Sequence, residues 1–424
     1  MVEISDEPKL DDYFETTHAD RGNDMTVYIL EAIRAPRGKA KSDGALHTVM
    51  PAELLGQLYK ELDQRVGLRE HPIDEVFTGC VTPIGDQGGN IGHVAMRMAN
   101  VKCHSTGITL SSFCSSSIST LSLARSRLLA GEGSLYISAG VESMSREPLL
   151  SDKPYGFVNK EATQSIPVMP NPLIADIIAT RNGYSREQLD NYALNSHRKA
   201  GHATENGYFK RSLIPIKNNN NEVLLDHDEI IRANTSLEKL SALPALFAER
   251  GIQGFENVIQ RFFPEINQVN HMHHAGNAPG MVDGASLVLL GNSDSAKTLQ
   301  LEPRARLIDI STQTAPPHLG LGGAAAAAKH LLHKNKLKSS DIDLWEFNEG
   351  FAGIACDFKD QLHVPDDRYN VNGSGIAMGH AMGATGGNII SILCDELERR
   401  NLKRGILAIS GAMGAGAAVL IERP

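Results

Sequence analysis

The chain has 424 residues and a formal net charge of −9, with 41 Lys and Arg against 50 Asp and Glu. A net-acidic chain has no general attraction for nucleic acid or for an anionic membrane surface, so neither is an expected partner. Its length and its 41% content of hydrophobic residues predict two or three globular domains. The five cysteines show no paired spacing and the polar start lacks a signal-peptide pattern, so we expect a cytoplasmic protein with a flexible acidic leader at residues 1–24.

Short apolar runs alternate with amphipathic stretches along the chain. Residues 26–30 predict a first strand, and Pro51 begins a predicted helix with one apolar face. The apolar runs at 135–137, 287–290 and 405–409 are typical of buried strands in a parallel sheet. This order of elements predicts an α/β fold.

One polar segment, residues 145–270, interrupts the pattern. It is rich in Pro, Asn, Lys and Glu and contains a predicted helix over 185–201, so we interpret it as an inserted subdomain. The runs 135–140 and 407–412 both place Ile-Ser before small residues, a short repeat that indicates two related halves.

Cys114 is the candidate nucleophile. It precedes a periodic apolar stretch, which predicts a strand-to-helix turn with the thiol at a helix N-terminus. The helix dipole and the free N–H groups at such a position lower the pKa of a thiol. The alternative is an inert buried cysteine, the interpretation that we give to Cys80, Cys103, Cys356 and Cys394.

His380 and Asn348 are candidate partners of that thiol. His380 lies in a run with five glycines between residues 373 and 386, so the backbone there passes close to another group on which the imidazole could act. A structural core histidine is the alternative. Asn348 follows a predicted strand at 344–347, where its amide either caps the next helix or donates to an oxyanion.

Three further motifs could form binding or catalytic sites. The loop 410–416 offers backbone N–H groups for an oxyanion hole. Residues 320–325 fit a dinucleotide fingerprint, but Pro316 and Pro317 exclude the buried strand that it requires. The histidines at 271, 273 and 274 are more typical of a loop than of a metal site, and we expect no bound metal.

Taken in order, these motifs resemble the thiolase family, the CoA-dependent 3-ketoacyl-CoA thiolases and acetyl-CoA acetyltransferases. Residues 139–145 and 348–352 and the segments around Cys114 and His380 carry the resemblance, which covers nearly the whole chain after the leader. It implies a five-layered α/β/α/β/α fold and a homodimer or homotetramer. The implied domains are an N-terminal half (25–145 plus 272–294), a loop domain (146–271) and a C-terminal half (295–424).

The resemblance also implies roles for single residues. Cys114 takes the acyl group and His380 is its base; Asn348 with a water and His380 line one oxyanion hole, and the N–H groups of Cys114 and Ala412 line the second. CoA and acyl-CoA are then substrates, with no covalently bound cofactor. The expected CoA contacts are Arg232, Ala275, Gly276 and Pro279.

The chain departs from the family pattern at several positions. Ungapped counting places Ser410 where the family has its second catalytic cysteine, the acid/base for the enolate, and a hydroxyl is a far poorer proton donor than a thiol near pH 7. Ser117 replaces a glycine, Ala381 a proline and Pro279 a serine. The connection 247–275 is long and carries Phe255, Phe262 and Phe263, which we expect to roof the acyl pocket or to contact another subunit.

Three functions stay open on the sequence alone. The first is an active thiolase-type acyltransferase. The second is a Cys-His-Asn condensing or C-acylating enzyme that does not deprotonate acetyl-CoA. The third is a thiolase-like CoA-binding subunit with little turnover.

Overall fold

A computed structural model describes residues 26–424 apart from 160, 163–165, 167 and 248–250. The expected leader at residues 1–24 lies outside these residues. Among the described helices, none combines the length and the apolar character that crossing a membrane requires.

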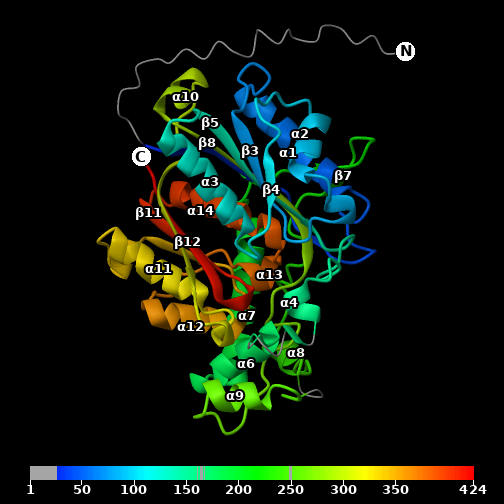
Figure 1. The fold of residues 1–424 in the computed structure, drawn as a ribbon, viewed down its shortest axis with the longest axis vertical. Helices are drawn as coiled ribbons and strands as arrows, with labels where there is room; N and C mark the ends of the chain where they lie inside the picture. Colours follow the sequence, from blue (N-terminus) through cyan, green and yellow to red (C-terminus); the bar gives the residue numbers. More distant parts are fainter. Residues whose placement is uncertain (1–25, 160, 163–165, 167, 248–250) are drawn as a thin grey trace.

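The N-terminal half is built on five strands (Figure 1). Their order in the sheet is β4-β3-β5-β8-β1. The three strands β4, β3 and β5 are parallel, whereas β8 runs antiparallel to both β5 and β1. The bounds are β1 Tyr28–Arg34, β3 Glu75–Gly79, β4 Ile108–Leu110, β5 Leu135–Ser143 and β8 Val282–Gly291; the short β2, Gly38–Lys39, also pairs with β8.

The C-terminal half repeats this arrangement with one strand fewer. Its order is β10-β11-β12-β9, with β10 and β11 parallel and the other pairs antiparallel. The bounds are β9 Ala305–Thr314, β10 Leu344–Phe347, β11 Arg404–Ser410 and β12 Ala415–Glu422. The two halves join where β1 pairs with β9 over Tyr28–Arg306 and Ile29–Ala305. The repeat at 135–140 and 407–412 thus falls on the equivalent strands β5 and β11, and the expected duplication is confirmed.

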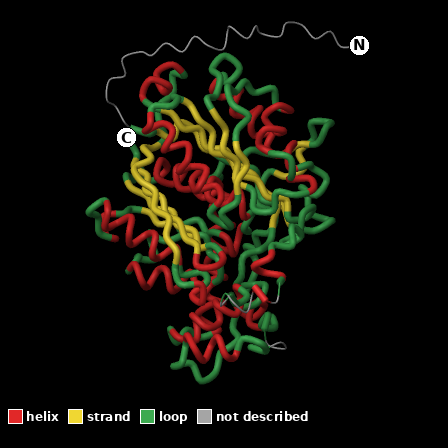
Figure 2. The backbone as a smooth tube through the Cα atoms, in the orientation of Figure 1, coloured by secondary structure: helices red, strands yellow, loops and turns green. Residues whose placement is uncertain are grey.

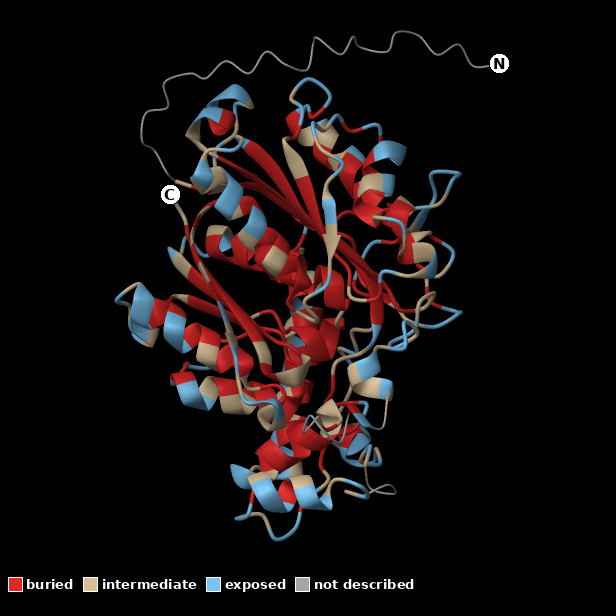
Figure 3. Cartoon of the chain, in the orientation of Figure 1, coloured by how far each residue is buried: buried red, intermediate tan, exposed pale blue. Residues whose placement is uncertain are grey.

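Helices form three layers around these strands (Figure 2). One outer layer has α1, Pro51–Val66, and α2, Ile91–Met98. The central layer has α3, Ser116–Ala130, and α14, Thr385–Arg399, whose apolar side chains pack on both sheets. The other outer layer has α11, Gly323–Lys334, and α12, Ala352–Leu362. The expected five-layered fold is confirmed, and most of its strands are buried, as is the central helix α14 (Figure 3).

The polar segment is mainly helical, and its helices α6, α8 and α9 lie at one end of the molecule, whereas β6 and β7 pack against the N-terminal half (Figure 1). Its long helix α7 begins after Ser185, whose hydroxyl accepts a hydrogen bond from the N–H of Gln188 in a capping box. The remaining elements are α4 Tyr155–Val158, α6 Asn171–Arg181, α7 Arg186–Glu205, β6 Ile216–Lys217, β7 Val223–Leu225, α8 Leu237–Ser241 and α9 Glu256–Phe262. Short helices α10, Ser293–Thr298, and α13, Gly375–Met378, lie in the two halves.

Two expectations need correction or refinement. The run 287–290 belongs to β8, which is antiparallel to its neighbours, so the prediction of a parallel sheet is wrong for that strand. A continuous apolar run indicates that a strand is buried on both faces, and here helix layers cover both faces of β8. Such a run does not indicate the direction of the strand. The rings at 255, 262 and 263 pack inside the chain: the Phe262 ring stacks on the His318 ring with centroids 4.2 Å apart.

Candidate active site

Cys114 lies at the turn between β4 and α3. Ser115 is the N-cap of α3, so the thiol stands at the helix N-terminus as predicted. Phe113, immediately before it, has a left-handed φ of 53°. That conformation is rare and costly for a bulky side chain, and such strain gathers at functional sites.

The predicted lowering of the thiol pKa is wrong in its net direction. Burial raises the pKa of Cys114 to about 11, although hydrogen bonds from the backbone N–H groups of Ala412 and of Cys114 itself favour the thiolate. Desolvation of the charged form therefore outweighs the helix terminus. The resting nucleophile is a neutral thiol that needs a base.

His380 is held by contacts on both its backbone and its ring. Its N–H donates to the carbonyl of Gly280 over 2.9 Å, beside the start of β8. Ring atom Nδ1 is 2.7 Å from Thr385 Oγ1 and 3.3 Å from Asn348 Nδ2. When Nδ1 donates its hydrogen to Thr385 Oγ1, Nε2 of the neutral ring carries the lone pair and can accept the thiol proton.

The imidazole is neutral in the resting site. Burial, and then the charge of Arg37, lower the pKa of His380 to about 4. Arg37 is itself buried, and its Nη1 donates to the carbonyl of Gly379 over 3.3 Å. An uncharged imidazole can accept a proton at neutral pH, as a general base requires.

Asn348 does not cap the following helix. The N-cap of α12 is Phe351, and no side chain caps that helix. Asn348 instead directly follows β10, with its N–H donating to the carbonyl of Ala408 over 3.0 Å and its side-chain Nδ2 lying 3.3 Å from His380 Nδ1. The capping interpretation is therefore wrong, and the role of Asn348 as an oxyanion donor stays a prediction.

Ser410 and Ala412 follow the equivalent strand β11. The hydroxyl of Ser410 is buried and donates to the carbonyl of Leu321 over 2.5 Å. Ala412 begins a short 3₁₀ turn in which Met413 has a left-handed φ of 57°. This turn aims the Ala412 N–H at the Cys114 thiol, so the structure brings Cys114 and Ala412 together and, separately, His380 and Asn348.

The four expected CoA contacts come from two segments, 228–232 and 275–280, which meet where Ile230 approaches Gly280. Arg232 and Ala275 are exposed, Gly276 is buried and Pro279 is partly exposed. The second segment is tied to the site because Gly280, next to Pro279, accepts the hydrogen bond from the His380 N–H. On the Arg232 side, Ile230 packs against Val282 and Ala381.

The model of the thiolase N-terminal domain matches residues 27–254, and that of the thiolase C-terminal domain matches residues 301–423. The chain belongs to the thiolase family. It is an acyltransferase of that family.

Individual thiolases agree with this membership over nearly their whole length. The β-ketoadipyl-CoA thiolase of Pseudomonas aeruginosa is 32% identical over 94% of this chain and 99% of the relative. The 3-ketoacyl-CoA thiolase of Photorhabdus laumondii is 31% identical, with the same coverage. Among solved structures, Bacillus anthracis acetyl-CoA acetyltransferase has a TM-score of 0.79 and 30% identity over 94% of this chain and 99% of its own. Human mitochondrial 3-ketoacyl-CoA thiolase has a TM-score of 0.80 and 26% identity, covering 94% and 98%.

The histidine cluster of this thiolase is structural. Nδ1 of His273 is 2.7 Å from Asp176, and its Nε2 accepts a hydrogen bond from the Gly353 N–H at the start of α12. His274 is 2.6 Å from Asp190 in the same buried region. Among the described residues, no group of three or more His, Cys, Asp or Glu side chains is arranged to hold a metal ion.

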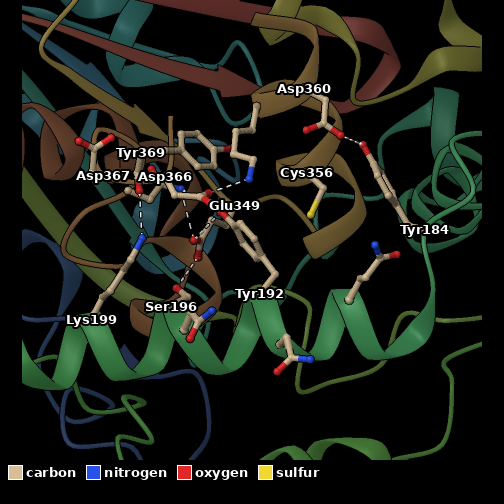
Figure 4. Close-up of a pocket in the computed structure, with 15 residues that line it drawn as sticks. Tyr184, Tyr192, Ser196, Lys199, Glu349, Cys356, Asp360, Asp366, Asp367 and Tyr369 are labelled. Carbon is tan, nitrogen blue, oxygen red and sulfur yellow. Dashed lines mark hydrogen bonds and ion pairs between the residues drawn. The ribbon is translucent and has the colours of Figure 1, made fainter. Parts of the chain in front are cut away.

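A cavity of about 600 Å³ lies behind the Asn348 motif, between α7 and α12 (Figure 4). Its wall includes the buried carboxylate of Glu349, which accepts hydrogen bonds from Tyr192 at 2.9 Å and Ser196 at 2.7 Å. Neither Cys114 nor His380 lines it. The cavity therefore adjoins the Asn348 motif through Glu349, and we do not identify it with the acyl pocket.

Sequence reasoning missed three supporting residues. Thr385 contacts the His380 ring, and Arg37 lowers its pKa. The buried carboxylate of Glu142 accepts hydrogen bonds from the N–H groups of Val81 and Gly383, each over 2.9 Å, which fastens the loop after His380 to the end of β3. Only Thr385 had a local signal, as one of two hydroxyl residues in the glycine-rich run, with Ser374; the other two residues depend on contacts between distant segments.

Proposed function

We propose that this thiolase transfers acyl groups between a 3-ketoacyl thioester and coenzyme A through an acyl-enzyme on Cys114. The observation that carries the proposal is the pair of loops that lead into the two packed central helices, α3 and α14. One supplies a thiol at a helix N-terminus with the Ala412 N–H beside it, and the other supplies a neutral imidazole backed by Asn348. Relatives named for 3-ketoacyl-CoA and β-ketoadipyl-CoA, and a human thiolase solved in complex with CoA, support the substrate class.

In thiolysis, His380 takes the proton of Cys114 as sulfur attacks the keto carbon. The carbonyl oxygen becomes an oxyanion, which the N–H groups of Cys114 and Ala412 stabilise. The bond between C2 and C3 then breaks, leaving an acyl-enzyme and the enolate of acetyl-CoA, which takes up a proton. Attack by the thiol of a second CoA releases the shortened acyl-CoA and restores the Cys114 thiol.

The second oxyanion is stabilised by Asn348, acting through a water, and by His380. In this role the enolate oxygen, which carries the charge after C–C cleavage, accepts from the imidazole N–H and the water. The CoA moiety extends along Arg232, Ala275, Gly276 and Pro279. A net charge of −9 does not attract tetra-anionic CoA, so local groups such as Arg232 supply the attraction.

Ser410 supports a second candidate. Its hydroxyl donates to the carbonyl of Leu321, and a hydroxyl gives up a proton far less readily than a thiol. This position favours acyl transfer or C-acylation without proton exchange at C2 of acetyl-CoA. Thiolysis of acetoacetyl-CoA distinguishes the two activities, because only the first requires protonation of the enolate.

The remaining features of the proposal concern the whole chain. We assign residues 25–145 with 272–294 and residues 295–424 to the two halves, and residues 146–271 to a loop domain. We propose a homodimer or homotetramer in a reducing compartment such as the cytoplasm. The five free cysteines and the open edge of β4 support these assignments.

Incubation with acetyl-CoA followed by intact-mass measurement tests the nucleophile. We expect one acetyl adduct that maps to Cys114 and is lost in Cys114→Ala. Cys394→Ala removes a buried thiol on α14 and is the matched control, with the adduct retained. Tight CoA binding without an adduct would favour the CoA-binding subunit, and an adduct that persists in Cys114→Ala would reject the mechanism.

A further inference from the structure

Ser117 occupies a position that connects the two central helices. It is the second residue of α3, is 3% exposed, and stands three residues after Cys114. Its Oγ accepts a hydrogen bond from the N–H of Gly386 over 2.8 Å, and a longer one from Gly387 over 3.4 Å. These two N–H groups occupy the second and third positions of α14.

Those N–H groups are the ones that an N-cap side chain normally satisfies. The N-cap of α14 is Ala384, which has no side-chain acceptor, and no cap hydrogen bond is formed within that helix. Ser117 therefore caps α14 from another helix. The close approach requires a glycine at 386, because a Cβ at that position would lie only 2.7 Å from Ser117 Oγ and would clash with it.

The capped turn is also the one that holds His380. Thr385, the first residue of α14, contacts Nδ1 of His380 at 2.7 Å and directly precedes Gly386. The chain of contacts thus runs from Cys114 through Ser117 and Gly386 to Thr385 and the imidazole. Its two ends are the nucleophile and its base.

Glycine contacts make this junction tight. A Cβ at Gly79 would lie 2.8 Å from the backbone of Ser117 and 2.9 Å from the carbonyl of Gly383. Interiors packed this closely transmit small displacements instead of absorbing them. A change at Ser117 is therefore felt at the first turn of α14.

We propose that Ser117 is a positioning residue that fixes His380 relative to Cys114 by capping α14 from the nucleophile helix. The inference rests on the proposed roles of those two residues. A serine here, in place of the glycine expected from the family pattern, supplies the acceptor that Ala384 lacks.

Ser117→Ala tests this by removing the acceptor without opening a cavity. We expect kcat for acetoacetyl-CoA thiolysis to fall by about tenfold, with KM for CoA unchanged, because the loss concerns the reacting groups and not CoA binding. Ser391→Ala is the control. It removes a buried hydroxyl that belongs to α14 itself and donates to the carbonyl of Asn388. We expect kcat of the control to stay within about twofold of wild type.

A double-mutant cycle identifies the route. Thr385→Val removes the contact with His380, so if Ser117 acts through that turn, Ser117→Ala lowers kcat by less than about twofold in the Thr385→Val background. Ser117→Gly serves in the same cycle if the alanine variant does not fold. Fully multiplicative effects, or equal losses in Ser117→Ala and Ser391→Ala, would overturn the proposal. Absence of the Cys114 adduct in the otherwise unchanged enzyme would instead reject the proposed function.

Discussion

The Cys114 thiol experiences two opposing effects, and burial is the larger. A thiol with a pKa of about 11 loses its proton only above the usual range, so its thiolate fraction rises tenfold per pH unit through pH 9. We expect the rate of Cys114 alkylation by iodoacetamide to rise steadily from pH 6 to pH 10. His380 stays neutral over that range, so no step appears near pH 6.5.

Peptide mapping by mass spectrometry measures this profile at Cys114 alone. A short cysteine peptide, with an ordinary pKa of about 8.5, is the reference and levels off within the same range. A plateau of the Cys114 rate below pH 8 would contradict the raised pKa.

Ser410 is the other residue at which chemistry and structure can be separated. Replacing its hydroxyl by a thiol restores a group that exchanges protons near neutral pH, so we expect Ser410→Cys to raise the rate of acetoacetyl-CoA thiolysis by about tenfold or more. Ser410→Ala removes only the hydrogen bond to Leu321 and is expected to change the rate by less than Ser410→Cys does. An unchanged rate in Ser410→Cys would show that another group protonates the enolate.

At the scale of elements, one buried ion pair fastens β1 to the segment that carries Arg232. Arg34 and Asp228 are both fully buried and form two hydrogen bonds of 2.8 and 2.9 Å. Burial opposes ionisation of Asp228, but the charges of Arg34 and Arg37, with their hydrogen bonds, outweigh it and lower the pKa of this carboxyl. Its charge therefore stabilises the fold above the unfolded-state pKa of about 3.9, and this contribution is lost as the pH falls below it.

Asp228→Asn leaves the Arg34 charge buried without a partner. We expect a loss of about 3–5 kcal/mol in the free energy of unfolding at pH 7, and a higher KM for CoA because Arg232 is displaced. Urea unfolding and thiolysis kinetics measure the two effects. Asp43→Asn breaks the exposed Lys39–Asp43 pair and is expected to leave both unchanged. Equal stability of the Asp228→Asn variant and the wild type would show that this pair does not stabilise the fold.

Local pattern determined which elements could be predicted. The apolar runs located β5, β8 and β11, the helical stretch predicted over 185–201 located α7, and the stretch after Cys114 located α3. Features that depend on distant partners were not accessible: Ser117 meets Gly386 across 269 positions, and Arg34 meets Asp228 across 194. The direction of the Cys114 pKa shift was mispredicted for the same reason, because the sequence shows the helix start but not the burial around it.

At the scale of the molecule, the two halves place equivalent helices back to back. Helix α3 precedes β5 as α14 precedes β11, and each follows one of the proposed catalytic residues. The duplicated architecture therefore brings Cys114 and His380 from equivalent positions to one central layer. The proposed nucleophile and the proposed base thus come from different halves, which are joined by the β1–β9 pairing, by the packing of this layer and by buried contacts such as Arg304–Glu31.

The sheet remains open at β4, which has a partner only on the β3 side in the described chain. Around this edge, Ile108 is 42% exposed, and Val94, Met98 and Leu123 are also exposed. Open strand edges with apolar neighbours favour pairing with another chain. We expect Ile108→Lys to shift the sedimenting species from an oligomer toward the monomer, with loss of thiolysis because β4 leads into the Cys114 turn. Val223→Lys, at an exposed position of β7, is the control and keeps the wild-type mass. A monomeric wild type, or an Ile108→Lys variant of unchanged mass, would rule out this edge as the subunit contact.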